Sequence, residues 1–413
     1  MQAYLLEFGN LLLRWLHVVA AIAWIGESIY FVMLDNSLRP PTSAEGKKRG
    51  VFGEMWAVHG GGFYHNQKYL TNPAELPNDL HWSFWKAYTT WLTGFAIFAT
   101  MYLVKPDFYL VNAASQWAWA ASLAGWQASV LAVVFLLAGW VIYDQLCRRI
   151  SPNMEHDGIL SVAVAVMMVA VAYLSCQIFP GRAAFLITGA VMATCMSANV
   201  FFWIIPGQRR MVKALKAGEK PDPLDGKRGK QRSVHNTYFT LPVVLLMLSN
   251  HYSFIYSGAY AWVILSLFIV SGAAIRQYFV LRHSGQNKLV YPVVGVALLG
   301  VIAYLAAPQP AASTGAAGST AETVVTTQQV MQIMQARCVQ CHAAKPSHFA
   351  FPAAPAGMAL ETEQELLAHP DLIKQVVANG YMPLGNLTDM TPDERAAVAA
   401  WSLPPAASQP THR

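Results

Sequence analysis

Two cysteines and a histidine stand close together near the C-terminus, in the run Cys338-Val339-Gln340-Cys341-His342. The Cys-x-x-Cys-His pattern is an attachment signal for c-type heme, because the two thiols bond the porphyrin and the next imidazole is held over the iron as an axial ligand. A redox dithiol or half of a zinc site could use this cysteine spacing, but no βαβ pattern surrounds the pair and no second pair follows. The motif therefore predicts one covalent heme c.

The iron of such a heme needs a sixth ligand on its other face, and a methionine thioether there raises the reduction potential. Met382, followed by Pro383, lies about forty residues after the motif, in a loop between two expected helices. Met358 and Met390 are rival candidates, although Met390 precedes the Thr-Pro start of a helix and is expected to pack instead. We therefore predict that His342 and Met382 bind the iron.

Residues 54–85 hold a second concentration of reactive side chains. His59, His65 and His81 are candidates for a catalytic base, and the sequence does not decide between them. Consecutive glycines let backbone N–H groups approach a ligand, aromatic rings stack on a planar molecule, and a lysine binds an anion. An aromatic belt at a membrane surface, with a flexible turn, is the simpler alternative. The candidate substrate-binding residues are Gly60, Gly61, Gly62, Tyr64, Lys68 and Trp85.

Two further histidines, His17 and His251, stand in the outer parts of apolar segments. Ionisable residues inside membrane segments are functional candidates by default. Two imidazoles at one depth could bind a heme b that relays electrons outward. The simpler interpretation is that each imidazole forms a hydrogen bond to a neighbouring helix.

A mostly membrane-embedded chain must position these residues. Of its 413 residues, 55% are hydrophobic and only 12% are charged, which is typical of membrane proteins. Eight apolar stretches have the length needed to cross a hydrocarbon layer of about 30 Å. We therefore expect an all-α fold in which eight transmembrane helices form a bundle. The stretches are 10–34, 82–104, 118–146, 157–180, 183–205, 236–255, 258–281 and 289–306.

Basic residues gather in alternate connections between these stretches, and nine of them lie between Arg209 and Arg232. The other connections hold only Lys105 and Arg182. Since basic residues stay on the cytoplasmic side of a membrane, both termini are expected on the outer side. The net charge of +6 thus reflects topology and contact with membrane lipid, and we expect no nucleic-acid partner.

The sequence divides into four parts, beginning with a polytopic membrane domain over 1–306. An Ala-, Pro-, Ser- and Gly-rich stretch over 307–326 predicts a flexible linker, and a disordered tail is expected over 404–413. Between them, 327–403 carries the heme motif, with helices expected over 327–337, 362–379 and 392–402. This part is similar to class I cytochromes c over its full length.

The membrane part also resembles a known family. The residues that carry the resemblance are Trp24-Ile25-Gly26-Glu27, His59-Gly60-Gly61-Gly62-Phe63-Tyr64, Leu80-His81-Trp82 and Tyr88-Thr89-Thr90-Trp91-Leu92-Thr93-Gly94-Phe95. Together with the cytochrome tail, they resemble the membrane-bound urate hydroxylases, the cytochrome c-linked urate oxidases of bacteria, over essentially the whole chain. Lys86 departs from this pattern, since many relatives carry an acidic residue there.

The resemblance implies an oxidoreductase of purine catabolism that converts urate to 5-hydroxyisourate. Electrons would pass through the heme iron to a respiratory-chain acceptor, such as a cytochrome oxidase or a soluble cytochrome c. The protein would be a multi-pass protein of the bacterial inner membrane, with both termini and the cytochrome domain in the periplasm. Because residues 54–85 are expected on the opposite side, some electron relay across the bilayer would be needed.

A second function is compatible with the same residues. The chain could be a membrane electron-transfer subunit that carries electrons from quinol to a periplasmic acceptor, with no substrate of its own. Reduction of the heme by quinol in the absence of urate would distinguish this hypothesis from urate oxidation.

Overall fold

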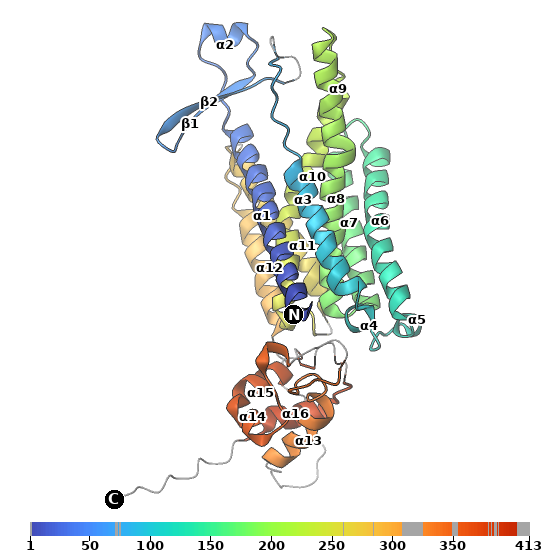
Figure 1. Ribbon diagram of the computed structural model, residues 1–413. Coiled ribbons are helices and arrows are strands. Elements are labelled where there is room, and N and C mark those ends of the chain that lie inside the picture. The colour runs from blue at the N-terminus through green and yellow to red at the C-terminus, as the bar shows by residue number, and fades with distance from the viewer. Residues whose placement is uncertain are drawn as a thin grey trace, which may run out of the picture.

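The computed structural model describes residues 2–70, 73, 76–258, 260–283, 285–307, 325–348, 354–378, 380, 382–383, 386 and 388–402. This part of the chain is predominantly helical and forms a long bundle with a small helical unit at one end (Figure 1). A helix occupies each of the eight apolar stretches. The helices of the bundle are α1 (Gln2–Ser37), α3 (Trp85–Phe98), α6 (Gly125–Ile150), α7 (Asp157–Ile178), α8 (Gly181–Ala198), α9 (Ile205–Lys216), α10 (Pro223–Leu248), α11 (Ala261–His283) and α12 (Val290–Ala306).

Among the described residues, five helices are long and apolar enough to cross a membrane, which indicates a membrane protein. They are Tyr4–Ser37, Gly125–Ile150, Asp157–Ile178, Gly181–Lys216 and Ala261–Arg282. The shorter α3 and α12 and the half-polar α10 pack against them. The short elements α4 (Pro106–Tyr109), α5 (Ala118–Ala121), η3 (Ser249–His251), η4 (Ser253–Ile255) and the π-helical η1 (Ala99–Leu103) lie at the ends of these helices.

Helix α8 forms the centre of the bundle, and most of its side chains are buried against α6, α7 and α10. Small residues allow this close packing. A Cβ atom at Gly139 of α6 would lie only 2.5 Å from Val191 Cγ1 of α8, so this contact between the two helices requires glycine.

The segment expected to be a long charged loop, 206–235, is largely helical. The π-helical η2 (Asn199–Ile204) joins α8 to α9, so the helix continues well past residue 205. Helix α10 begins at Pro223, where Asp222 accepts a hydrogen bond from the Leu224 N–H as an N-cap. Arg232 therefore lies inside a helix and is 2% exposed, which corrects its expected place in a connection between helices.

Residues between α1 and α3, for which no strand was predicted, form a β-hairpin after the short α2 (Ala44–Lys48). Strand β1 (Gly53–His59) pairs antiparallel with β2 (Gly62–Lys68), and His59 stands opposite Gly62. Gly60 and Gly61 form the two-residue turn with φ of 58° and 80°. Left-handed backbone at both turn positions matches the twist of a hairpin and favours glycine. The expectation of a predominantly helical fold is confirmed for the described residues, and this hairpin is the correction to the all-α prediction.

The C-terminal unit contains α13 (Thr327–Arg337), η5 (Pro355–Gly357), α14 (Glu363–Ala368), α15 (Pro370–Ala378) and α16 (Pro392–Ala400). The helix expected over 362–379 is thus two helices, broken before Pro370, which disfavours helical backbone at the preceding residue. Val330, Met334 and Trp401 belong to a small apolar core, and Met390 is buried in it at 3% exposure. The Trp401 indole donates a hydrogen bond to Thr327 Oγ1 at 3.3 Å, which ties the end of the unit to its first helix.

This unit lies at the end of the bundle that holds the N-terminus of α1, and the β-hairpin lies at the opposite end (Figure 1). The rings of Phe108 in α4 and His348 in the C-terminal unit are in edge contact, with centroids 5.8 Å apart. Most of the expected linker, 308–324, and the expected tail, 404–413, lie outside the described residues.

Candidate functional site

In the hairpin, the structure brings His65 against two residues of the neighbouring strand. Its ring stacks on Trp56, with centroids 4.2 Å apart and planes 5° apart, and its Nε2 lies 3.0 Å from Glu54 Oε2. Hydrogen bonds to the Glu54 carboxylate hold its pKa below the ordinary value. The largest effect comes from the Thr42 backbone N–H, and smaller ones come from the side chains of His65 and Gln67. His65 is therefore fixed by a carboxylate and an indole on the hairpin surface.

The other predicted residues of this region do not converge on it. Tyr64 is 53% exposed and Trp85 is 67% exposed, while His59 and His81 are also exposed. None of the contacts within the described residues joins any two of the three candidate histidines. The glycines have a conformational reason to be there, because the hairpin turn needs Gly60 and Gly61.

Lys68 at the end of β2 reaches the helical bundle. Its Nζ lies 2.6 Å from Asp35 Oδ1 at the end of α1, and Lys230 Nζ of α10 lies 3.5 Å from the other oxygen of that carboxylate. This link holds the hairpin against α1 and α10.

Lys86 of α3 forms an ion pair with Glu27 of α1 at 2.7 Å. Ser83 donates a hydrogen bond to the same carboxylate and accepts one from Lys86 at 2.9 Å. A lysine is accommodated here because the neighbouring helix supplies the opposite charge.

His17 of α1 contacts α3, whereas His251 lies in the turn after α10. His17 Nδ1 is 3.0 Å from both Thr90 O and Thr93 Oγ1 of α3, and a Cβ at Gly94 would lie 2.8 Å from its ring. His251 is exposed in the turn after α10, and its neighbour Asn250 accepts a hydrogen bond from Tyr102 of η1 at 3.0 Å. Binding of a heme b by the two histidines stays a prediction.

An ion pair is buried among α6, η2 and α10, where no site was predicted. Arg232 Nη2 donates to Asp144 Oδ1 at 2.8 Å, and Trp203 Nε1 donates to the same oxygen at 2.7 Å. Asp144 is 5% exposed, and its second oxygen pairs with Arg148 Nε at 2.6 Å. Every charge in this cluster therefore has a partner, as burial in a helical bundle demands.

The same cluster contains a hydrogen-bonded tyrosine and histidine. Tyr143 Oη lies 2.7 Å from His235 Nδ1 and accepts a hydrogen bond from Asn199 Nδ2 at 3.0 Å. The Arg232 guanidinium lies over the Tyr143 ring, 5.1 Å from its centroid. Asn199 is the first residue of the π-helical turn, and such turns often occur at functional sites. A tyrosine, an imidazole and a paired guanidinium thus meet inside the bundle.

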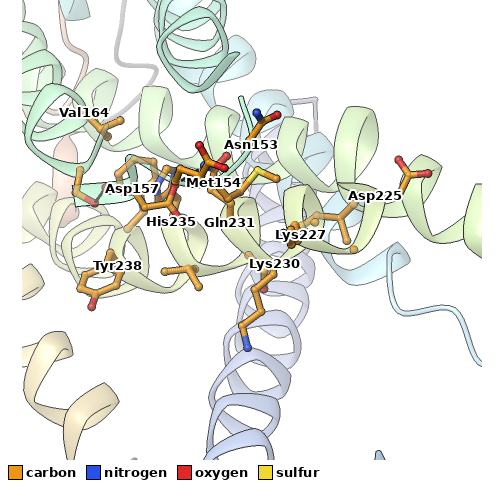
Figure 2. A pocket seen from close by; sticks show the side chains of 18 of the residues that line it. Asn153, Met154, Asp157, Val164, Asp225, Lys227, Lys230, Gln231, His235 and Tyr238 are labelled. Atoms are coloured by element: carbon orange, nitrogen blue, oxygen red, sulfur yellow. Dashed lines mark hydrogen bonds between the residues drawn. The ribbon is translucent and has the colours of Figure 1, made fainter. Parts of the chain in front are cut away.

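His235 also lines a cavity of about 1320 Å³ beside α7, α10 and α11 (Figure 2). Lys68 and Lys230 lie at its hairpin end, and Gln231 and Asp157 lie beside His235. Gln231 Nε2 donates to Asp157 Oδ1 at 2.6 Å, which fixes both side chains. The cavity therefore extends from the hairpin end of the bundle to the buried cluster.

Two signals in the sequence could have indicated this cluster. Asp144 is the only acidic residue in the apolar stretch 118–146, and intramembrane acids are functional candidates. His235 directly precedes the stretch that begins at residue 236. Its burial depends on helix α10 starting earlier than hydropathy suggests.

In the C-terminal unit, a backbone carbonyl orients the ring of His342, as is usual for a histidine that binds a metal ion. His342 Nδ1 lies 2.9 Å from the Met358 carbonyl oxygen and so donates to it, which leaves Nε2 available to a metal ion. Cys338 and Cys341 are both free, and burial raises the pKa of Cys338 to about 12 and also raises that of Cys341.

Met382, the predicted sixth ligand, is half-buried, and its backbone carbonyl accepts a hydrogen bond from Arg395 Nη1 of α16 at 2.7 Å. Arg395 Nη1 also donates to the Val377 carbonyl, so it fixes the end of α15 and the following loop to α16. Burial lowers the pKa of this guanidinium below its ordinary value. The neighbouring Tyr381 lies outside the described residues.

The fold defines a helical membrane protein with a cluster of paired ionisable groups buried inside its bundle. Residues 3–307 match the family model described as urate oxidase N-terminal, and the chain belongs to this family. It is thus related to urate oxidases, which are oxidoreductases that act on urate. Searches of the curated proteins and of the solved structures found no match.

Proposed function

We propose that the protein is a membrane-bound, cytochrome c-linked urate oxidase that forms 5-hydroxyisourate in purine catabolism. One observation carries the proposal. A single chain contains a urate oxidase N-terminal domain and a helical unit in which the Met358 carbonyl orients His342. Membership of the family is the basis for proposing urate as the substrate. The C-terminal unit holds the residues that would bind the electron-accepting heme.

The reaction balances without oxygen as a reactant. Urate monoanion and one water molecule give 5-hydroxyisourate, one proton and two electrons. The protein must therefore provide a group that accepts a proton and a route for electrons that leave one at a time. The first requirement concerns the membrane domain, and the second concerns the C-terminal unit.

The residues that would hold the heme are Cys338 and Cys341 through their thiols and His342 and Met382 as axial ligands. When bound, the heme supplies reversible one-electron acceptance. The chain's own part is to fix these ligands. The Met358 carbonyl orients the His342 ring, and Arg395 holds the backbone at Met382.

The proposed location is the bacterial inner membrane, with both termini and the C-terminal unit in the periplasm. Two observations support this orientation. The C-terminal unit shares one end of the bundle with the N-terminus, and the basic α9 and the start of α10 lie at the opposite end (Figure 1). The electrons would then pass to a respiratory acceptor such as a cytochrome oxidase or a soluble cytochrome c.

The proposal is tested with the full chain in membranes, kept free of oxygen and supplied with oxidised soluble cytochrome c. We expect urate to disappear, 5-hydroxyisourate to form and the heme to become reduced. A Cys338→Ala/Cys341→Ala variant serves as the control, because it retains the membrane domain and lacks the attachment sites. Persistence of urate while the heme stays oxidised would overturn the proposal. Heme reduction by quinol, with urate untouched, would support the electron-transfer subunit instead.

A further inference from the structure

The cavity beside His235 has the features of a binding site for a small polar molecule. Its volume of about 1320 Å³ exceeds that of one bicyclic ligand, and its walls combine apolar helix surface with lysines and amides. Lys68, Lys227 and Lys230 line it, together with Gln231 of α10 and Gln277 of α11. The side walls include Tyr238 and Phe239.

Most acidic side chains that line this cavity are already paired, so its lysines can attract an anionic ligand. Asp157 accepts hydrogen bonds from Ser151 at 2.7 Å and from Gln231 at 2.6 Å. Asp225, at the hairpin end, forms an ion pair with Arg210 at 2.5 Å. Two of the three lining acids are therefore already engaged. Lys230, whose side chain is 69% exposed, shares Asp35 with Lys68 and is the more distant of the two lysines, at 3.5 Å against 2.6 Å, so it can turn toward a ligand while Lys68 keeps the link to α1.

His235 stands between the cavity and the buried cluster. Its Nδ1 contacts Tyr143 at 2.7 Å, and within the described part of the chain no hydrogen bond engages Nε2. The Tyr143 hydroxyl already accepts a hydrogen bond from Asn199 and can accept a second from Nδ1–H. In that tautomer Nε2 carries a lone pair on the ring that lines the cavity, and protonation at Nε2 leaves the bond to Tyr143 intact.

From this geometry we propose that the cavity binds a planar, oxidised purine anion such as urate, and that His235 is the catalytic residue that takes up the proton released in the reaction. This inference rests on the proposed function. The oxygen of a water molecule bonds to the purine while one of the water's protons goes to His235 Nε2. The two electrons would pass one at a time to the heme that Cys338, Cys341, His342 and Met382 would hold. Tyr143 acts as a positioning residue that holds the imidazole through Nδ1.

The occupancy of the cavity is tested with two adjacent residues of α7. Ala165 lines the cavity, whereas Val166 is 63% exposed on the outer face of the same helix. In the full-length protein in lipid nanodiscs, Ala165→Phe should raise KM for urate at least tenfold, and Val166→Phe should leave it within twofold. An unchanged KM in Ala165→Phe, or phospholipid retained in the cavity at full urate turnover, would overturn the inference.

The role of His235 is tested separately from binding. General-base catalysis contributes about 10²–10⁴-fold, so His235→Gln should lower kcat by at least a hundredfold. Tyr143→Phe should lower kcat while KM stays constant, since it removes the hydroxyl and keeps the ring. Heme reduction by dithionite should be unchanged in both variants, which shows that the acceptor is intact. If wild-type protein oxidises urate and His235→Gln does so at the same rate, this inference fails while the proposed function stands. If wild-type protein fails to oxidise urate, the proposed function itself fails.

Discussion

Arg232 and Asp144 face each other at 2.8 Å inside the bundle, although they are 88 residues apart in the sequence. Arg232 is 2% exposed and Asp144 is 5% exposed, so neither charge is solvated by water. The pair joins α10 to α6, and the same guanidinium lies over the Tyr143 ring. The ion pair therefore forms one wall of the cluster that contains His235.

Removal of one member of this pair should be costly. Asp144→Asn leaves the Arg232 guanidinium buried without a counter-charge, which is expected to cost about 3–5 kcal/mol of stability. The measurement is the thermal unfolding midpoint of the full protein in detergent. Replacing both charges, as in Asp144→Asn/Arg232→Met, should recover part of the loss, because no isolated charge then remains.

The matched control is Asp35→Asn. Asp35 also pairs with a cation, Lys68, but both side chains are about one-third exposed. Pairs of this kind contribute about 0–1 kcal/mol, so the midpoint should change little. If Asp144→Asn and Asp35→Asn lowered the unfolding midpoint equally, burial would not determine how much the Asp144–Arg232 pair contributes to stability.

The glycines of the hairpin give a prediction that separates two interpretations. If Gly60 and Gly61 serve only the turn, Gly60→Asn should retain urate oxidation, because asparagine adopts left-handed backbone at the first position of such turns. Gly61→Val should destabilise the hairpin, since a β-branched residue in left-handed backbone costs about 1–2 kcal/mol. Rates of proteolytic cleavage within 53–68 measure the stability of the hairpin.

The alternative is that Gly60 and Gly61 contact the substrate through their backbone. If the backbone of these glycines must approach the substrate, any side chain at Gly60 would abolish activity even though the hairpin stays resistant to protease. Gly62→Ala is the control for the hairpin's stability and should leave its resistance to protease unchanged. Gly62 has no left-handed backbone, and a Cβ there meets nothing closer than 3.8 Å.

Local signals in the sequence predict some elements well. Thr326 and Thr391 precede glutamine or glutamate three residues later, and each forms a capping box at the start of a C-terminal helix. The hairpin was missed although Gly60-Gly61 between strands is a recognised turn signal. The three consecutive glycines are compatible with a ligand cradle and with a flexible turn, and the pairing of the flanking segments depends on contacts that the local sequence does not reveal.

The buried cluster could not be located from local patterns. Arg232 lowers the hydropathy of the start of α10, so the apolar stretch was expected to begin at residue 236. The residue is tolerated in the bundle because Asp144, on another helix, neutralises it. That compensation depends on how α6 and α10 pack, which no segment reveals alone. The heme motif was found because its chemistry requires neighbouring residues.

Acid should loosen the C-terminal unit through Glu394. The Thr391 backbone N–H, at 2.8 Å, and the Arg337 guanidinium, at 3.1 Å, hold the pKa of Glu394 below its ordinary value. A lowered folded-state pKa contributes stability above the unfolded-state pKa of about 4.3, and this contribution disappears as the pH falls through the folded-state value. Wild-type protein should therefore exceed Glu394→Gln in unfolding midpoint at neutral pH, and the difference should close in acid. Heme absorbance follows the transition, and a difference that stays constant with pH would contradict the assigned role.

The two axial ligands should respond differently to substitution. His342→Ala removes the imidazole next to the attachment cysteines, so electron delivery from urate should stop and the low-spin heme spectrum should be lost. Met382→Ala should also stop delivery, because the thioether sets a high reduction potential, yet it leaves both thiols in place. Heme staining on a denaturing gel should therefore remain positive for Met382→Ala, and redox titration should show a lowered potential. Met358→Leu is the control, since it keeps the backbone carbonyl that contacts His342 at 2.9 Å. Loss of the methionine-ligated spectrum in Met358→Leu, with retention in Met382→Ala, would transfer the sixth-ligand role to Met358.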